Sequence, residues 1–270
     1  MVTTPGIGIL QPHSDGSTRR RRGRPPVILS PGITALPSLA AQGAAVHDTV
    51  YLTLRQAQMA GQFWPGLEFV VRTLATRLGV SPMPVREALR RLVAEKALET
   101  GANGIVRVPL ASRNVLRDLT LCRVLIEGNA AAQGARKGGP ALANRLHAIN
   151  AEMQAAAAAR DIDRLLAVNQ QFHFALYAAA SSPIAMPLIE SLWLQAGPYL
   201  NMMREALLVA TILDHHIEVI AAAASGDAPA AAAAIAADIE EAARVMLELI
   251  PPDAQDQPGQ AAAITSSAAR

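Results

Sequence analysis

Residues 71–92, VRTLATRLGVSPMPVREALRRL, contain the pattern that decides the fold of the N-terminal part of the chain. The first eight of these residues have the apolar spacing of a short helix, and Gly79 is of a type that commonly ends one. Ser81 is a good N-cap residue. Pro82 and Pro84 then fit the first turn of a second helix, where a missing N–H breaks no intrahelical hydrogen bond. The pattern predicts two helices joined by a tight turn.

The second of these helices should have an apolar face and a basic face. Apolar residues recur at helical spacing and should face the core, at Val85, Ala88, Leu89 and Leu92. Arginines should project outward, at Arg86, Arg90 and Arg91. A helix, a tight turn and a second helix with basic residues are typical of a helix-turn-helix motif, whose second helix enters the major groove of DNA.

The flanking segments extend the motif to a winged helix-turn-helix domain over residues 46–110. Residues 46–60 have the pattern of a preceding helix. After the motif, residues 97–99 and 105–108 are candidates for short strands on either side of Asn103-Gly104, a strong hairpin signal. We therefore expect a two-stranded wing beside the helices.

The composition favours a mainly α protein. Hydrophobic residues make up 51% of the 270 residues and aromatic residues only 3%, and alanine runs such as 155–159 and 230–234 are frequent. Alanine favours closely packed helices over aromatic-rich β-sandwiches. The single cysteine, Cys122, cannot form an internal disulfide, and no stretch approaches the roughly 18 apolar residues of a membrane helix. We expect a soluble, cytoplasmic protein that makes no membrane contact.

Charge is distributed unevenly between the two halves of the chain. Residues 1–110 hold 13 Lys and Arg against 6 Asp and Glu, whereas residues 111–270 hold 11 against 16. A basic N-terminal half suits a polyanion such as DNA, and an acidic C-terminal half does not. Chance clustering is the alternative, which charge alone leaves open.

The two ends of the chain are predicted to be disordered. Residues 1–45 are rich in Gly, Pro and Ser and lack an amphipathic period, so we expect a disordered basic arm. The arm contains RRRRGRPP at 19–26, which is similar to an AT-hook, an element whose arginines enter the minor groove of A·T-rich DNA. A solvated basic tail is the alternative. Residues 251–270 lack periodicity and predict a frayed tail.

Residues 114–250 are predicted to form an antiparallel all-α bundle. Their helical pattern is interrupted by Gly, Pro and Ser at four places, namely 137–140, 181–183, 196–198 and 225–229. These breaks leave room for about six or seven helices joined by short turns. The fold class is therefore mainly α, with a small winged domain followed by a helical one.

The chain resembles a known family over roughly residues 46–248. The most specific part is the turn and second helix at 79–92, together with the preceding Pro65-Gly66. Further anchors are RVLIE at 123–127, NQQFH at 169–173, and the segment from His216 to Asp227. On these residues the sequence is similar to GntR-type transcription regulators of the FadR subfamily, whose C-terminal part is the helical FCD domain.

The resemblance implies a DNA-binding regulator and not an enzyme. It implies a homodimer whose paired winged domains bind an inverted repeat in double-stranded operator DNA. The helical domain would bind a small organic acid, and occupancy would change operator affinity by altering the spacing of the winged domains. A metal-dependent enzyme is the less favoured alternative, because no nucleophile elbow, phosphate loop or H-E-x-x-H helix is present.

Arg86 is the leading candidate for reading bases. A guanidinium at the N-terminal end of the second helix can donate two hydrogen bonds to guanine O6 and N7, or can hold a phosphate. The alternative is a surface arginine that pairs with Glu87 or Glu95.

Other candidates for DNA contact lie around Arg86. The resembling family often has Arg where this chain has Pro82, so the operator should differ from that of such relatives. Met83 offers an apolar contact to a thymine methyl group, and Asn103 and Gly104 permit close approach of the wing, although an ordinary hairpin turn is nearly as good an explanation. The full candidate set is Arg72, Ser81, Met83, Arg86, Arg90, Asn103 and Gly104.

Four residues of the helical domain are candidate metal ligands. Asn169 and His173 are four residues apart and share a helix face. His216 and Asp238 each lie 11 residues from Asp227, so a helical hairpin that turns near Asp227 brings them level. Two imidazoles and a carboxylate suit Zn²⁺, Ni²⁺, Mn²⁺ or Fe²⁺.

The resemblance implies a divalent metal held by one Asp and three His, and two of the four ligands differ here. Asn169 stands in place of the Asp, and Asp238 in place of the last His. The alternative is a lost metal site that leaves a metal-free polar pocket. Arg123 matches an inward-facing arginine of the family and is the candidate partner for an effector carboxylate, with Arg204 as a second candidate. A salt bridge from Arg123 to Glu127 is the alternative.

Overall fold

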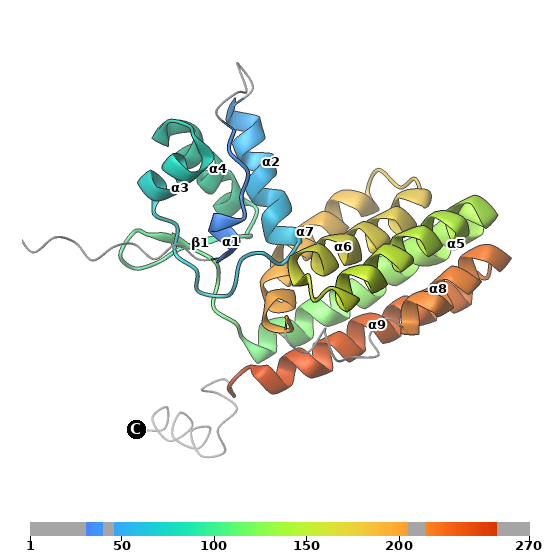
Figure 1. Cartoon of the computed structure of the whole chain (residues 1–270). Coiled ribbons are helices and arrows are strands. Elements are labelled where there is room, and N and C mark those ends of the chain that lie inside the picture. Colours follow the sequence, from blue (N-terminus) through green and yellow to red (C-terminus); the bar gives the residue numbers. More distant parts are fainter. Residues whose placement is uncertain (1–30, 40–45, 205–213, 253–270) are drawn as a thin grey trace, which may run out of the picture.

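The computed structural model describes residues 31–39, 46–204 and 214–252, and these residues form a small N-terminal domain above a larger helical domain (Figure 1). The N-terminal domain contains α1 (Pro31–Thr34), α2 (Val46–Met59), α3 (Val71–Leu78), α4 (Pro82–Ala94), β1 (Glu99–Thr100) and β2 (Val106–Arg107). The helical domain contains α5 (Arg113–Ala158), α6 (Ile162–Ala179), α7 (Ala185–Met202), α8 (Asp214–Ser225) and α9 (Ala228–Leu249). The predicted mainly α class is confirmed.

Helices α3 and α4 form the predicted helix-turn-helix. Gly79 is left-handed at φ 69°, and its N–H and that of Val80 donate to the carbonyls of Thr76 and Ala75. Pro82 is the first residue of α4. The expected inward side chains are buried, among them Leu74, Leu78, Val85, Ala88, Leu89 and Leu92. The motif is thus held by the packing of α3 against α4, and α4 packs in turn against α2.

The wing is present but its strands are shorter than predicted. β1 and β2 are antiparallel, with Glu99 opposite Arg107 and Thr100 opposite Val106. The segment before α3 extends the pairing, because the N–H of Phe69 donates to the carbonyl of Val106 at 2.8 Å. The predicted winged helix-turn-helix therefore gains a third extended segment from residues before the motif.

Residues 31–39 are ordered, which corrects the predicted boundary of the N-terminal arm at residue 45. Ile33, Leu36 and Leu39 are at most 5% exposed, and the N–H of Leu39 donates to the carbonyl of Leu78 at 2.7 Å. The apolar residues recur at every third position only three times, among Pro, Gly and Ser. So short a pattern does not predict an ordered segment. Residues 19–26, which resemble an AT-hook, and residues 253–270 lie outside the described part of the chain.

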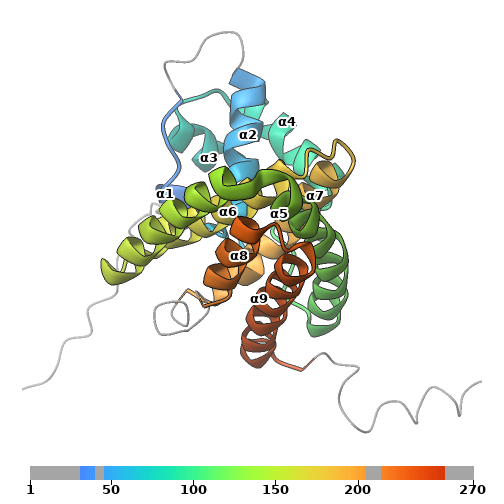
Figure 2. The ribbon, with the colours of Figure 1, turned by 90° about the vertical axis from the view of Figure 1, so that its right-hand side faces the viewer.

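The helical domain is an antiparallel bundle around α5. Helix α5 packs against α6, α8 and α9, and Figure 2 shows α8 and α9 side by side. The predicted break at 137–140 is a kink within α5, where Gly139 has φ 55° and ψ −156° ahead of Pro140. None of the helices in the described ranges is both long enough and apolar enough to cross a membrane.

The predicted break at 196–198 was wrong, because α7 continues through it to Met202. Pro198 leaves the carbonyl of Leu194 without its helical donor. The side-chain amide of Gln58 on α2 donates to that carbonyl at 3.1 Å. A Cβ atom on Gly197 would lie 1.8 Å from the carbonyl oxygen of Gln58, so the contact needs a glycine. Proline and glycine here allow α2 to pack directly on α7.

Candidate DNA-reading helix and metal pocket

The exposed face of α4 carries the side chains predicted to read DNA. Arg86 is exposed and has no ion-pair partner within residues 31–39, 46–204 and 214–252. Its two alternative partners are engaged elsewhere: the Glu87 carboxylate lies 3.7 Å from Arg90, and Glu95 accepts from Tyr51 and Arg55. The geometry therefore leaves the Arg86 guanidinium available to a ligand outside the chain.

The other predicted DNA contacts fall into two groups. Those on the helix-turn-helix are all exposed, namely Arg72, Ser81, Met83 and Arg90. In the wing, Asn103 and Gly104 are exposed, but the Asn103 side-chain oxygen accepts the N–H of Ile105 at 3.0 Å. Asn103 thus acts as a turn residue, in line with the alternative that the sequence left open.

Arg91 stays partly exposed, at 41% of its side chain, but reaches across to α2. Its guanidinium lies over the Tyr51 ring, 3.6 Å from the centroid, and donates to Asp48 at 2.8 Å. Both partners belong to α2, which sequence spacing within α4 cannot reveal. Arg91 therefore fixes α4 to α2 and is not a DNA-contact candidate.

Three of the four predicted metal ligands converge in the core of the helical domain. His173 on α6, His216 on α8 and Asp238 on α9 are buried. His173 Nε2 lies 3.4 Å from His216 Nε2 and 3.4 Å from Asp238 Oδ2, and His216 Nε2 lies 3.6 Å from Asp238 Oδ1. Ligand atoms that hold a metal tetrahedrally at about 2.1 Å lie about 3.4 Å apart. The two histidine nitrogens and the Asp238 carboxylate, whose two oxygens each face one of them, therefore have the spacing of a metal site.

A hydrogen-bonded chain behind His173 sets its tautomer. His173 Nδ1 lies 3.1 Å from the hydroxyl of Tyr177, and that hydroxyl donates to Glu127 at 2.8 Å. Because the Tyr177 proton goes to the carboxylate, the hydroxyl oxygen accepts from Nδ1–H. The Nε2 atom of His173 is then left with its lone pair, which is the form that binds a metal.

Burial sets the charge state of the cluster. It lowers the pKa of His173 well below its usual range and that of His216 to about 4, so both imidazoles are neutral at pH 7. Burial also raises the pKa of Asp238 to about 7, although Arg123 opposes the shift. Two neutral imidazoles and a carboxylate destabilised by burial fit a bound divalent cation.

The cavity at the cluster has the size of an ion. Its lining includes Asn169, Arg123, His173 and Asp238, and its volume is about 20 Å³. A water molecule needs about 15 Å³, so this space fits one ion or water and excludes an organic acid unless side chains move. Asn169 is half-buried and lines this cavity together with His173 and Asp238, whereas His216 is not among the lining residues.

The two candidate effector arginines lie in different surroundings. Arg123 is buried and donates to Glu127 at 2.7 and 3.3 Å, so the alternative salt bridge is formed while the residue also lines the cavity. Arg204 donates to Asp163 at 2.6 Å and is not part of the cavity lining. The structure therefore brings Arg123, but not Arg204, to the cluster.

Sequence reasoning missed the central role of Glu127. Besides Arg123 and Tyr177, the indole N–H of Trp193 donates to it at 2.9 Å. Tyr177 follows His173 by four residues and so shares its helix face. This spacing could have predicted the contact between Tyr177 and His173. Trp193 comes from α7, and no local spacing places it there.

Comparison with known proteins follows the same two-domain division. Residues 46–108 match the family of bacterial regulatory proteins described as gntR, and residues 118–241 match the FCD domain. The chain is 31% identical over 162 residues to the HTH-type transcriptional regulator McbR of Escherichia coli strain K12, covering 60% of this chain and 73% of McbR. The chain belongs to the GntR family.

Solved structures of GntR-type proteins share the arrangement of both domains. E. coli McbR/YncC has a TM-score of 0.70 at 26% identity, covering 76% of this chain and 98% of that one. A putative GntR regulator from Rhodococcus sp. RHA1 has a TM-score of 0.65 at 23% identity, with 77% and 100% covered, which supports the fold alone. This GntR protein is therefore a DNA-binding transcription regulator with a C-terminal effector-binding domain, and not an enzyme.

Proposed function

We propose that this protein regulates transcription by reading an inverted-repeat operator with α4 while its helical domain binds a small organic acid. The observation that carries the proposal is that Arg86, on the helix after the predicted tight turn, is exposed and has no ion-pair partner among the residues that the structure describes. The all-α effector domain favours the FadR subfamily among GntR proteins. Operator affinity would then respond to the acid, because both domains are joined through α2 and α7.

The proposed function is tested by binding of the purified protein to DNA from upstream of its own gene. We expect a gel shift that persists in excess unrelated DNA. Footprinting should show protection of two half-sites about one helical turn of DNA apart. Adding candidate organic acids should change the affinity. Binding that is equal on all sequences contradicts the proposal.

We further propose that His173, His216 and Asp238 hold a divalent metal such as Zn²⁺, Ni²⁺, Mn²⁺ or Fe²⁺. The 3.4 to 3.6 Å spacing of their ligand atoms and the ion-sized cavity support it. Bound there, the ion would act as a Lewis acid that attracts an effector carboxylate. The Arg123 guanidinium would donate to the other oxygen of that carboxylate. A metal-free pocket, in which the histidines and Arg123 bind the acid directly, is the second candidate.

We propose that the regulator is a homodimer through α5 and α7, which pack against each other. Large apolar residues are exposed on α5, on α7 and at the residue that precedes α7, namely Leu121, Leu125, Leu188 and Ile184, with exposed fractions between 49% and 73%. Apolar side chains gathered on neighbouring helices are typical of an interface.

The dimer proposal predicts that Leu125→Glu yields a monomer, because a twofold axis brings two charges into one apolar interface. Sedimentation equilibrium measures the mass. Leu249→Glu, at a residue that is 46% exposed on α9, is the matched control and should remain dimeric. A Leu125→Glu protein with the mass of the wild type contradicts this interface.

A further prediction concerns the basic arm. We expect removal of residues 1–30 to weaken operator binding mainly at low salt, because five arginines in the arm would release counterions from DNA. The slope of log K against log salt should fall by up to about 4.5, at 0.9 for each phosphate contact. The truncation must end before Ile33, since removal of buried Ile33, Leu36 and Leu39 would expose the core. An unchanged slope would mean that the arm does not touch DNA.

A further inference from the structure

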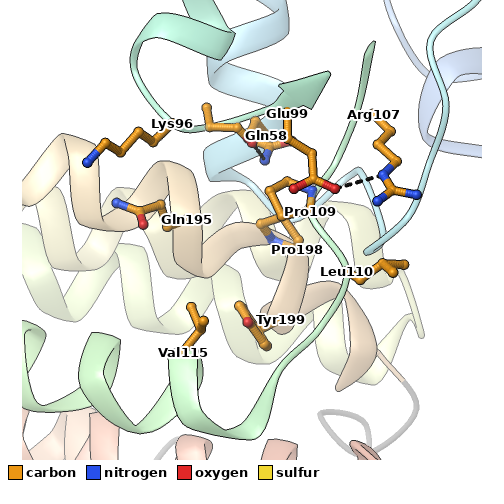
Figure 3. A pocket seen from close by; sticks show the side chains of 11 residues that line it. Gln58, Lys96, Glu99, Arg107, Pro109, Leu110, Val115, Gln195, Pro198 and Tyr199 are labelled. Carbon is orange, nitrogen blue, oxygen red and sulfur yellow. Dashed lines mark hydrogen bonds and ion pairs between the residues drawn. The ribbon is translucent and has the colours of Figure 1, made fainter. Parts of the chain in front are cut away.

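A second cavity lies where the winged domain meets the helical domain (Figure 3). Its volume is about 350 Å³, within the range of small-molecule sites. One wall is formed by Lys96, Glu99 and Arg107 of the winged domain, and the opposite wall by Val115 of α5 and Tyr199 of α7. In the described part of the chain it shares no lining residue with the cavity at the histidines.

A buried hydrogen-bond acceptor without a donor belongs to this cavity. Gln58 lines it and is 1% exposed. Its amide nitrogen donates to the carbonyls of Ala97 and Leu194, at 3.0 and 3.1 Å. Its Oε1 atom has no donor among the residues that the structure describes. Buried polar atoms are seldom left unpaired, and neighbouring atoms enclose this oxygen, so a donor in the cavity would reach it after a small shift of the Gln58 side chain.

The remaining lining combines apolar side chains with the polar Gln195, the Glu99–Arg107 ion pair and the positive charge of Lys96. Leu110, Val115, Pro198 and Tyr199 supply the apolar surface. Arg107 is neutralised by Glu99 at 2.7 Å. Lys96 is exposed and makes no ion pair with any residue in the described ranges. It therefore gives the cavity lining a net positive charge.

We propose that this interdomain cavity is a second small-molecule site, which binds an amphipathic organic anion. The apolar body of the ligand would lie on Val115, Pro198 and Tyr199, its acid group would face Lys96, and an N–H or O–H would donate to Gln58. Since both domains line the cavity, an occupant would oppose their separation. Any effect on operator affinity rests on the proposed function, whereas binding of the anion does not.

The test uses 1-anilinonaphthalene-8-sulfonate, which combines a naphthalene ring, a sulfonate and an N–H donor, and the full-length protein. Fluorescence titration and calorimetry should give saturable binding at one site per chain. Val115→Glu should abolish it by placing a carboxylate in the cavity. Val115 is 50% exposed and the Ser112 hydroxyl accepts its backbone N–H at 3.3 Å, so glutamate there keeps the N-terminal cap of α5 and should preserve the helix.

Lys96→Gln should weaken binding about tenfold, because it removes the charge and keeps a side chain of similar length. The control is Leu52→Glu, at an exposed leucine of α2 that lines a different cavity, and it should bind as the wild type does. The proposal is overturned by absence of saturable binding, by unchanged binding in both cavity variants, or by equal loss in Leu52→Glu. A protein that binds the dye but no operator refutes the proposed function alone, and the reverse result refutes this site alone.

Discussion

Arg86→Ala is expected to abolish specific operator binding while leaving the melting temperature unchanged. Arg86 is exposed and unpaired within the described residues, so its removal costs the fold little. A base-reading arginine contributes about 1 to 3 kcal/mol of discrimination, and a dimer presents two copies, so the loss is about 2 to 6 kcal/mol. Fluorescence anisotropy on the operator and on a shuffled sequence measures both affinity and preference.

Arg244→Ala is the matched control for Arg86→Ala. Arg244 is an exposed arginine on α9, where it lies 3.6 Å from Glu241 and 3.7 Å from Glu248. Its removal changes the net charge by the same amount at a place remote from α4. If the two variants bind the operator alike, then Arg86 acts only through overall charge and does not read bases.

His216→Ala is expected to remove close to one divalent metal per chain and to lower thermal stability. A metal that binds only the folded state adds about 4 kcal/mol when present at 1,000 times its Kd, and a chelator should remove the same amount from the wild type. Native mass spectrometry measures the metal and calorimetry the melting temperature. His215→Ala is the control: its imidazole bonds to Glu218 and Glu241 and is no part of the cluster, so the metal should remain.

Two further variants at the cluster test whether Asn169 and Asp238 bind a metal or line a metal-free pocket. Asn169→Asp should tighten metal binding by adding a charged oxygen donor at the cavity, and Asp238→Ala should weaken it by deleting the carboxylate of the cluster. A wild-type protein that purifies without metal, and whose stability ignores both chelator and added Zn²⁺ or Ni²⁺, would favour the metal-free pocket. The DNA-binding assignment would be unaffected, because it depends on α4.

The elements that local spacing determines were predictable from the sequence. The helix at 71–78 has the predicted bounds, because its apolar stripe and the left-handed Gly79 are both local. The approach of His216 to Asp238 was predictable because each lies 11 residues from Asp227, in the turn that joins two antiparallel helices. Each of these features needs only residues close in sequence and the geometry of a helix.

The features that the sequence did not predict depend on distant partners. Pro198 is compatible with a continuous α7 because Gln58, 136 residues before Leu194, supplies the missing donor. Arg91 contacts α2 at the surface because that helix offers the Tyr51 ring and the Asp48 carboxylate. Glu127 is tied to Trp193 across two helices. No periodicity within one segment contains this information.

The close contact of α2 with α7 limits how this regulator can be recombined with its relatives. A hybrid protein that joins this winged domain to another helical domain would place a foreign side chain opposite the backbone of Gln58, where only a hydrogen atom fits at position 197. It would also lose the hydrogen bond from the Gln58 side-chain amide to the Leu194 carbonyl, which has no helical donor because residue 198 is proline. Gln58, Gly197 and Pro198 should therefore be transplanted as a set when biosensors are assembled from this scaffold.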